Sequence, residues 1–172
     1  YSNTGIQRSG ATPMGAWTTT TVAGKHEFRK EMSEIICAHH IPYAAQASVS
    51  KPMDLFNKIT KAKNIKGPRY IEILAPCPPG WRFGMDKTVD MGDLALETGA
   101  WALFESVDGE VTFNGKSKLI LEEKITPKPI EEWMKYQGRF RHLFVPQRDD
   151  DTLKAIQKHT EELWDRYRKE YL

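Results

Sequence analysis

The first half of the chain alternates between helical and strand-like patterns, and this alternation constrains the fold more than any other feature. Apolar residues at helical spacing predict an amphipathic helix over 27–39, and the short apolar run 41–49 predicts a buried strand. A second helix is predicted from Pro52, with Ser50 as its N-cap, and residues 69–75 predict another strand. Short strands that alternate with helices are typical of an α/β fold with a mainly parallel sheet.

Both predicted helices have one apolar face, which should pack against the sheet. On the first helix this face consists of Phe28, Met32, Ile35 and Ile36. On the second helix it consists of Leu55, Phe56, Ile59 and Ala62. The second helix also carries a row of lysines, which we expect to be solvated, with the docking of an acidic redox partner as the alternative. These lysines are Lys58, Lys61, Lys63 and Lys66.

The second half of the chain predicts a mostly helical extension with one hairpin. Asp108-Gly109, between two short apolar segments, is a strong hairpin signal. In chain order, the other expected elements are a helix over 86–100, a proline-broken connector over 124–129, a short helix over 130–136, a basic turn over 138–143 and a long helix over 149–171. We therefore expect the distal half of a domain over 1–85 and a C-terminal extension over 86–172 that packs on partner subunits.

Composition and charge exclude several classes of protein. The 172 residues carry 25 Lys and Arg against 23 Asp and Glu, which argues against a nucleic-acid partner bound through a broad basic face. The longest uncharged apolar run, 41–49, is too short to span a bilayer, so no membrane association is expected. Two cysteines are too few for a disulfide framework or for a zinc site of their own. These properties predict a cytoplasmic protein.

Two loops carry residues that are suited to catalysis or to ligand binding. The Asn3-Thr4-Gly5 loop offers hydroxyls, backbone N–H groups and an amide to an anionic or carbonyl ligand, although a turn capped by an Asx side chain is the alternative. Cys77 follows the predicted strand 69–75 in a stiff loop rich in proline. Its thiolate would suit a nucleophile or a soft-metal ligand, and a small buried hydrophobic residue is the alternative.

Two further groups of residues invite a functional interpretation. Cys37 lies near a pair of histidines at 39–40, but consecutive histidines at a helix end point in different directions, so a structural role is expected. The basic group Arg139, Arg141 and His142 offers contacts to phosphate. We favour the alternative for this group, which is pairing with carboxylates of a neighbouring subunit.

Several short blocks of sequence occur in a fixed order between residue 1 and about residue 145. They are YSNTGIQ at 1–7 followed by Ser9, Ala11-Thr12-Pro13 and Gly15-Ala16, then Ile41-Pro42-Tyr43, Gly67-Pro68, APCPPGW at 75–81 and Glu97-Thr98-Gly99. Together these blocks resemble the thiamine-pyrophosphate-binding β subunit of the 2-oxoacid:ferredoxin oxidoreductases, and its pyruvate branch in particular. The terminal helix matches that family weakly.

The resemblance implies a fold, an activity and a set of site residues. The fold would be the C-terminal half of a thiamine-diphosphate-binding domain. The activity would convert pyruvate and coenzyme A to acetyl-CoA and CO₂, with electrons passing through [4Fe–4S] clusters to ferredoxin. Asn3 would be a catalytic residue beside the thiazolium and the 2-oxoacid, and together with Tyr1, Ser2 and Thr4 it would help to bind the cofactor. Cys77 would ligate a [4Fe–4S] cluster.

Parts of the family pattern are expected outside this sequence. In the family, the Gly-Asp-Gly segment, the magnesium-binding positions and the other cluster cysteines precede the YSNTG block. Thiamine pyrophosphate, Mg²⁺ and the [4Fe–4S] cluster would therefore be shared with segments absent from this chain. The implied partners are the N-terminal half of the β subunit, α-, γ- and δ-type subunits or domains, and ferredoxin. Two alternatives stay open: the same chemistry on another 2-oxoacid (branched-chain, aromatic, 2-oxoglutarate or oxalate), and a non-catalytic scaffold derived from the fold.

Overall fold

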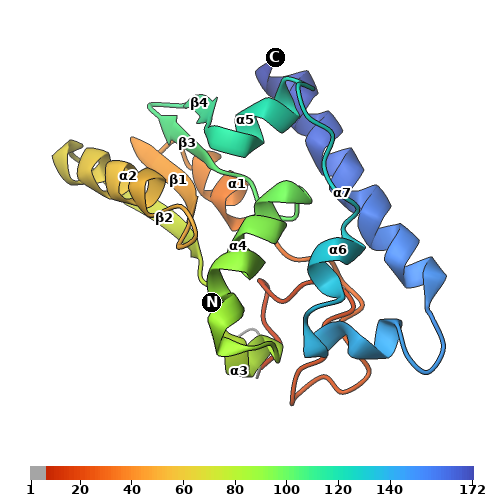
Figure 1. Ribbon diagram of the computed structural model, residues 1–172. Helices are drawn as coiled ribbons and strands as arrows, with labels where there is room; N and C mark the ends of the chain where they lie inside the picture. Colours follow the sequence, from red (N-terminus) through yellow and green to blue (C-terminus); the bar gives the residue numbers. More distant parts are fainter. Residues whose placement is uncertain (1–6) are drawn as a thin grey trace.

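The computed structural model describes residues 7–172, and the predicted site residues Tyr1, Ser2, Asn3 and Thr4 lie outside this part. Figure 1 shows the arrangement of the elements. In chain order they are α1 (Met32–Cys37), β1 (Tyr43–Ser48), α2 (Pro52–Asn64), β2 (Arg69–Leu74), α3 (Pro78–Trp81), the 3₁₀ helix η1 (Met85–Lys87), α4 (Thr88–Glu97), β3 (Phe104–Val107), β4 (Glu110–Phe113), α5 (Gly115–Leu121), α6 (Glu131–Met134), the 3₁₀ helix η2 (Gly138–Leu143) and α7 (Asp150–Tyr171).

The strands β1 to β4 form one mixed sheet in the order β2-β1-β3-β4. β1 and β2 run parallel, with Tyr43 opposite Arg69. β3 pairs antiparallel with β1, and β4 pairs antiparallel with β3. The α/β fold, the parallel pair and the hairpin are therefore confirmed. In the hairpin turn, Asp108 and Gly109 have φ angles of 49° and 90°, which is the left-handed region that an Asp-Gly pair accepts.

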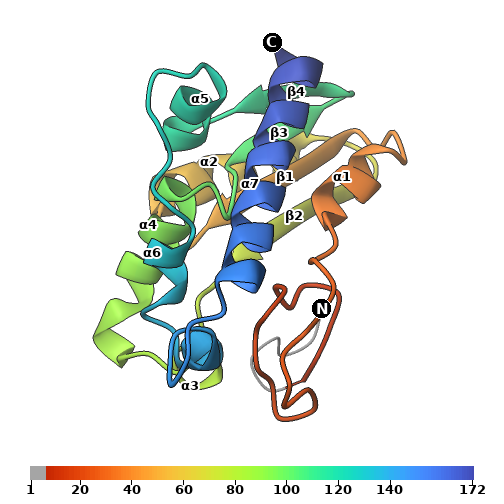
Figure 2. The same cartoon turned by 90° about the vertical axis from the view of Figure 1, so that its right-hand side faces the viewer.

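Helices cover both faces of this sheet. Figure 2 shows α2 behind the sheet and α1 and α7 in front of it. β1 is buried along its whole length, because it has a strand on each side and packs against both α1 and α2. β2 lies at one edge of the described sheet and is partly exposed. Its carboxyl end leads into the loop that carries Cys77.

The first predicted helix is shorter than its apolar pattern suggests. α1 begins only at Met32, because the segment before it is folded around Lys25. The buried Lys25 ammonium donates to the carbonyl oxygens of Ser9 (3.2 Å), Thr12 (2.7 Å) and Phe28 (3.3 Å). The Phe28 carbonyl therefore accepts from a lysine instead of from a helical N–H four residues later.

The apolar face predicted for this helix is wrong in part. Ile35 is 45% exposed, and the buried residue of α1 is Ser33. The reason is that the sheet presents a polar surface to α1. Ser33 Oγ donates to Glu72 Oε2 (2.7 Å), and Gln46 Nε2 donates to the same oxygen (3.2 Å). A carboxylate shielded by a helix needs such donors, so a hydroxyl packs here in place of an aliphatic side chain.

The second predicted helix, α2, is anchored by a lysine. Phe56 and Ile59, which were expected to pack against the sheet, are exposed, Phe56 by 62%. Lys58, which was expected in solvent, is buried. Its ammonium donates to the Asp54 carboxylate (2.8 Å) and to the carbonyl of Gln46 on β1 (2.7 Å). The aliphatic stem of a lysine can cover apolar surface while its charged end is paired, which explains why Lys58 is buried against the sheet and the apolar residues are not.

The start of α2 also differs from the prediction. Pro52 occupies the first turn, as predicted, but Lys51 is the N-cap residue. Ser50 instead exchanges a hydrogen bond with Ser48 through their Oγ atoms (2.9 Å). At the other end of the helix, Ala62 is buried as predicted.

We expect Lys58→Ala to lower the free energy of unfolding by about 2 kcal/mol, because it removes a charged hydrogen bond and leaves the Gln46 carbonyl buried without its donor. Lys63→Ala, on an exposed position of the same helix, is the matched control and should change stability by less than about 0.5 kcal/mol. Urea unfolding of the full-length protein measures both effects. Equal losses for the two variants would show that Lys58 does not anchor the helix.

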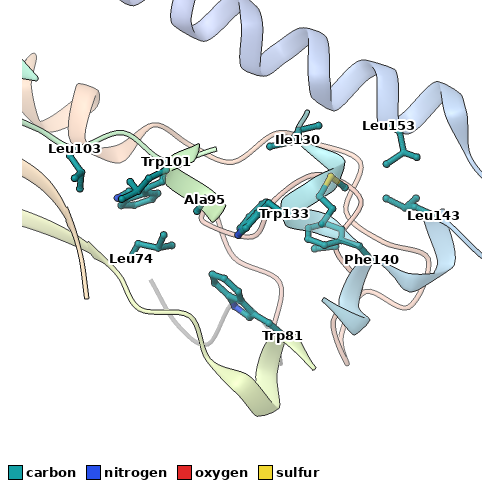
Figure 3. Packing of buried hydrophobic residues seen from close by; sticks show 13 residues of the cluster. Leu74, Trp81, Ala95, Trp101, Leu103, Ile130, Trp133, Phe140, Leu143 and Leu153 are labelled. Carbon is teal, nitrogen blue, oxygen red and sulfur yellow. The ribbon is translucent and has the colours of Figure 1, made fainter. Parts of the chain in front are cut away.

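Among residues 7–172, three clusters of buried apolar residues connect the helices to the sheet, and α7 contributes to two of them. The smallest cluster, Tyr43, Ala45 and Ala62, joins α2 to β1. The tryptophan core, shown in Figure 3, consists of Ala16, Leu74, Trp81, Ala95, Leu96, Trp101, Leu103, Ile130, Trp133, Met134, Phe140, Leu143 and Leu153. The hairpin core consists of Ala102, Phe104, Phe113, Ile120, Leu121, Leu163, Trp164 and Tyr167.

The C-terminal elements largely follow the prediction. The long helix α7 is confirmed, and the Asp149 side chain caps it by accepting from the Thr152 backbone N–H (3.0 Å). The short helix α5 was not predicted, and it buries Ile120 and Leu121 in the hairpin core. Within residues 7–172, no helix combines the length and the apolar character that crossing a membrane requires.

Candidate functional site

Cys77 lies just beyond the carboxyl end of β2, as the sequence predicted. It is a free, half-buried thiol and packs against the tryptophan core. It is also the N-cap residue of α3, and its carbonyl accepts from the Trp81 N–H (2.8 Å). In open α/β sheets, ligands bind beyond the carboxyl ends of the parallel strands, so the thiol is at the edge of the sheet where such a site is expected.

The short helix α3 fixes the backbone around this thiol. Pro78 occupies its first turn, where a missing N–H costs no hydrogen bond. Arg82 ends it in a left-handed conformation, with φ 61°. The carbonyl of Arg82 accepts from the Gly138 N–H (2.9 Å), which joins α3 to η2. This connection brings the next residue, Arg139, to the same end of the molecule as Cys77.

Arg139 is completely buried in an aromatic surrounding. Its Cζ atom lies 3.8 Å from the ring centroid of Trp81, 5.0 Å from that of Phe140 and 5.6 Å from that of Trp133. Figure 3 shows these three rings side by side in the tryptophan core. Aromatic faces attract a guanidinium, so they hold the side chain in place without neutralising its charge.

The guanidinium has unused hydrogen-bonding capacity. Its Nε donates to Gln137 Oε1 (2.8 Å), but Nη1 and Nη2 are buried and have no hydrogen-bond partner among the described residues. The nearby Trp133 Nε1 is likewise buried and unpartnered. Burial lowers the pKa of Arg139, and the negative charge of a Cys77 thiolate acts in the opposite direction. Trp81 connects the two residues, because its ring lies over the Arg139 guanidinium and its backbone N–H donates to the Cys77 carbonyl.

The segment that follows the YSNTG block packs against the same region. The Trp17 backbone N–H donates to the Arg139 carbonyl (2.8 Å), and the Arg82 guanidinium lies 3.7 Å from the centroid of the Trp17 ring. The buried Lys25 ammonium holds this loop together from inside. The predicted thiamine-site residues themselves lie outside the described part, so their arrangement stays a prediction.

Comparison with known proteins gives a consistent result. The chain is 44% identical over 174 residues to the ketoisovalerate oxidoreductase subunit VorB of Pyrococcus abyssi, covering 98% of this chain and 53% of that protein. It is 41% identical over 180 residues to the pyruvate synthase subunit PorB of Pyrococcus horikoshii, covering 95% and 54%. For PorB of Methanothermobacter marburgensis the identity is 45% over 153 residues, covering 86% and 51%.

The chain is homologous to these oxidoreductase subunits over nearly its whole length. It spans about half the length of the curated relatives that it matches. No protein-family profile matches it. The homology supports the family resemblance seen in the sequence. Because the relatives include subunits of both pyruvate synthase and ketoisovalerate oxidoreductase, the comparisons do not identify which 2-oxoacid is the substrate.

Cys37 and the histidines beside it do not form a second site within residues 7–172. His39 and His40 are exposed, and burial is the main cause of a raised pKa for the Cys37 thiol, which a hydrogen bond with Ser106 partly offsets. A raised pKa makes a thiol less reactive. Within the described residues, no three His, Cys, Asp or Glu side chains gather closely enough to hold a metal ion.

The basic group at 139–142 is divided by the structure. Arg141 and His142 are exposed, whereas Arg139 is buried. The sequence prediction treated the three as one basic group and so missed that Arg139 belongs with Cys77. The sequence does contain one hint that Arg139 is buried: the aromatic residue Phe140 is next to it, and Trp81 and Trp133 are available to pack around it.

Proposed function

We propose that this chain is the C-terminal half of the thiamine-pyrophosphate-binding subunit of a pyruvate:ferredoxin oxidoreductase. The reaction is pyruvate + CoA + 2 oxidised ferredoxin → acetyl-CoA + CO₂ + 2 reduced ferredoxin + H⁺. The observation that carries the proposal is the position of Cys77 at the carboxyl end of β2, in a chain homologous to PorB and VorB subunits. A non-catalytic scaffold would have no need of a cysteine there beside a buried arginine without an anion.

The donor set near Cys77 is compatible with an iron–sulfur cluster. A cysteine thiolate is the usual ligand of such clusters, and the unpartnered N–H groups of Arg139 and Trp133 are suitable donors to an anionic sulfur group. In the proposed enzyme Cys77 supplies one of four thiolates, and the other three come from another segment. The cluster supplies one-electron transfer.

The thiamine site is proposed from the sequence resemblance. Asn3 would hold the 2-oxoacid through its amide, while Tyr1, Ser2 and Thr4 would contact the thiamine pyrophosphate. Thiamine pyrophosphate, held by Mg²⁺ and partner segments, supplies the electron sink for decarboxylation. The packing of Trp17 against Arg139 and Arg82 supports a thiamine site close to the cluster site, because this loop continues directly from the YSNTG block.

The proposed partners are the N-terminal half of the subunit, α-, γ- and δ-type subunits or domains, and ferredoxin. Exposed apolar side chains on α2, on β2 and near α4 support such contacts. Among them, Phe56, Ile73 and Met85 are exposed, Met85 by 84%. Both cysteines are free thiols, which suits the reducing cytoplasm that we propose as the compartment.

A second substrate has equal support from the comparisons, because the VorB relatives are named for ketoisovalerate. Measuring kcat/KM of the assembled enzyme on pyruvate and on ketoisovalerate decides between them. A ratio above about tenfold in favour of pyruvate corresponds to about 1.4 kcal/mol of discrimination and supports our assignment. A ratio in the opposite direction assigns the chain to the branched-chain alternative.

The test of the proposed function is the composition of the purified complex. We expect the chain, assembled with its partners, to contain thiamine pyrophosphate and iron, to show the broad visible absorption of [4Fe–4S] clusters and to reduce ferredoxin when pyruvate and coenzyme A are present. A colourless complex without thiamine pyrophosphate would reject the enzyme assignment in favour of a scaffold.

Replacing Asn3 by alanine tests the carbon chemistry separately. We expect Asn3→Ala to lower kcat at least about tenfold, because removal of a single preorganised donor to a developing charge has effects of this size or larger. Thiamine pyrophosphate content should stay near that of the wild type, as measured by fluorescence after oxidation to thiochrome. Gln7→Ala, at the end of the YSNTGIQ block, is the control because it removes another side-chain amide. Loss of the cofactor from Asn3→Ala would contradict a catalytic role and indicate a structural one.

A further inference from the structure

The buried Arg139 carries a charge that the described residues do not neutralise. A guanidinium stays protonated in proteins, and a buried charge is costly unless it is paired. The aromatic rings of Trp81, Trp133 and Phe140 contribute a weak attraction only. Gln137 is a neutral acceptor, which receives one of the five N–H bonds. A fold that retains such an arginine therefore requires an anion next to Nη1 and Nη2.

The surroundings of Arg139 indicate what kind of anion fits. Gln137 is itself held, because its Nε2 donates to the Trp133 carbonyl (2.7 Å), so the guanidinium is fixed at Nε and free at its two terminal nitrogens. Trp133 adds another unpartnered donor. Cys77 is the N-cap of α3, and its carbonyl accepts from the N–H of Trp81, the residue whose ring lies 3.8 Å from the Arg139 Cζ atom. Weakly hydrated donors and aromatic walls suit a large, soft anion with sulfur atoms on its surface.

We propose that Arg139 is the counter-ion of the iron–sulfur cluster that Cys77 ligates, with its free N–H groups directed at the sulfur atoms of the cluster. This inference rests on the proposed function and deepens it. Hydrogen bonds to sulfur and the net charge around a cluster set its reduction potential. A fixed positive charge favours the reduced cluster, which carries one more electron, over the oxidised cluster. Arg139 thus raises the potential at which the cluster accepts electrons.

The experiment is a redox titration of the assembled enzyme, followed by electron paramagnetic resonance. Arg139→Met removes the charge but keeps an unbranched side chain that packs against aromatic rings. We expect its equilibrium constant for one-electron reduction to fall at least tenfold, which is a shift of ~59 mV to more negative potential. The matched control is Arg141→Met, which removes an exposed arginine from the same 3₁₀ helix and should leave the potential unchanged.

A second variant separates charge from packing. Arg139→Lys keeps the charge and loses the planar geometry, so its potential should lie between those of the wild type and Arg139→Met. If Arg139→Met does not assemble, a potential below that of the wild type in Arg139→Lys still supports the proposal. The proposal is wrong if both variants have the wild-type reduction potential, or if both variants lose iron. If Arg139→Met dissociates the complex and Arg139→Lys assembles with wild-type potential, the anion is a carboxylate of a neighbouring chain.

The same titration distinguishes failure of this inference from failure of the proposed function. If Cys77→Ser leaves iron content and every cluster signal unchanged, Cys77 is not a ligand, and the proposed function and the inference fall together. If Cys77→Ser alters a cluster while Arg139→Met leaves its potential unchanged, the inference alone is wrong.

Discussion

If the proposed function is right, Cys77→Ser in the assembled complex should remove or convert one cluster. It should also slow pyruvate-dependent ferredoxin reduction at least about 100-fold, which is the upper end of the effect of losing an outer-sphere partner at a metal site. The hydroxyl of serine is a harder and less acidic ligand than a thiol, so it binds iron in a sulfur cluster poorly. The hydrogen bond from the Trp81 N–H to the Cys77 carbonyl fixes the backbone at this position, so the substitution changes the ligand atom and leaves the α3 backbone in place.

Three measurements check this expectation: iron content, the electron paramagnetic resonance of the reduced enzyme, and the rate of ferredoxin reduction. Thiamine pyrophosphate content should remain close to that of the wild type, because the proposed cofactor contacts lie in the YSNTG block. Cys37→Ser is the matched control, since Cys37 is also a free, half-buried thiol and lies at the end of α1 in contact with the hairpin core. If the two substitutions have equal effects, Cys77 is not a specific ligand of the cluster.

Gly99→Ala should be among the most destabilising single methyl additions in this chain. Gly99 has φ 72°, in the region that favours glycine, and a Cβ atom would overlap with the Trp164 side chain. Trp164 is buried in the hairpin core, and its Nε1 donates to the Gly99 carbonyl (3.0 Å). Backbone strain of about 1–2 kcal/mol adds to overpacking of about 1–3 kcal/mol.

A second glycine separates these two costs. Gly109 has φ 90°, but a Cβ atom there would have no neighbour within 4 Å. Gly109→Ala should therefore lower the free energy of unfolding by the backbone-strain cost alone, about 1–2 kcal/mol. Urea unfolding of the full-length protein, followed by tryptophan fluorescence, compares the two variants. If they are equally stable, the overlap with Trp164 costs nothing and the packing argument is wrong.

Local patterns predicted the elements whose burial is simple. β1 is covered on both faces, so a continuous apolar run identifies it. Asp108-Gly109 identifies the hairpin because its turn needs two residues with positive φ. α7 carries a capping aspartate and a long amphipathic pattern, and both are properties of the segment itself.

Patterns failed where a polar side chain occupies a buried position. Lys58 and Ser33 are buried because particular partners on the sheet, the Gln46 carbonyl and the Glu72 carboxylate, receive their hydrogen bonds. These partners are distant in sequence, so a helical pattern assigns such residues to solvent. Exposed apolar residues such as Phe56 and Ile35 were misassigned because apolar spacing along a helix does not show whether that face is buried or exposed.

The candidate site shows the same division. Cys77 could be placed from its sequence, because a strand followed by a proline-rich loop puts it at the carboxyl end of the sheet. Arg139 could not, because its place depends on the Gly138–Arg82 hydrogen bond and on rings from α3, α6 and η2. Its charge made it resemble the exposed Arg141 two residues later.

The path of α7 has a consequence for how the protein unfolds. Near its start the helix places Leu153 in the tryptophan core, and towards its end it places Trp164 and Tyr167 in the hairpin core. Neither cluster can therefore open without releasing part of the same continuous backbone hydrogen-bond ladder. The two clusters behave as one cooperative unit, so amide protons in the middle of α7 exchange with solvent only when the whole unit opens.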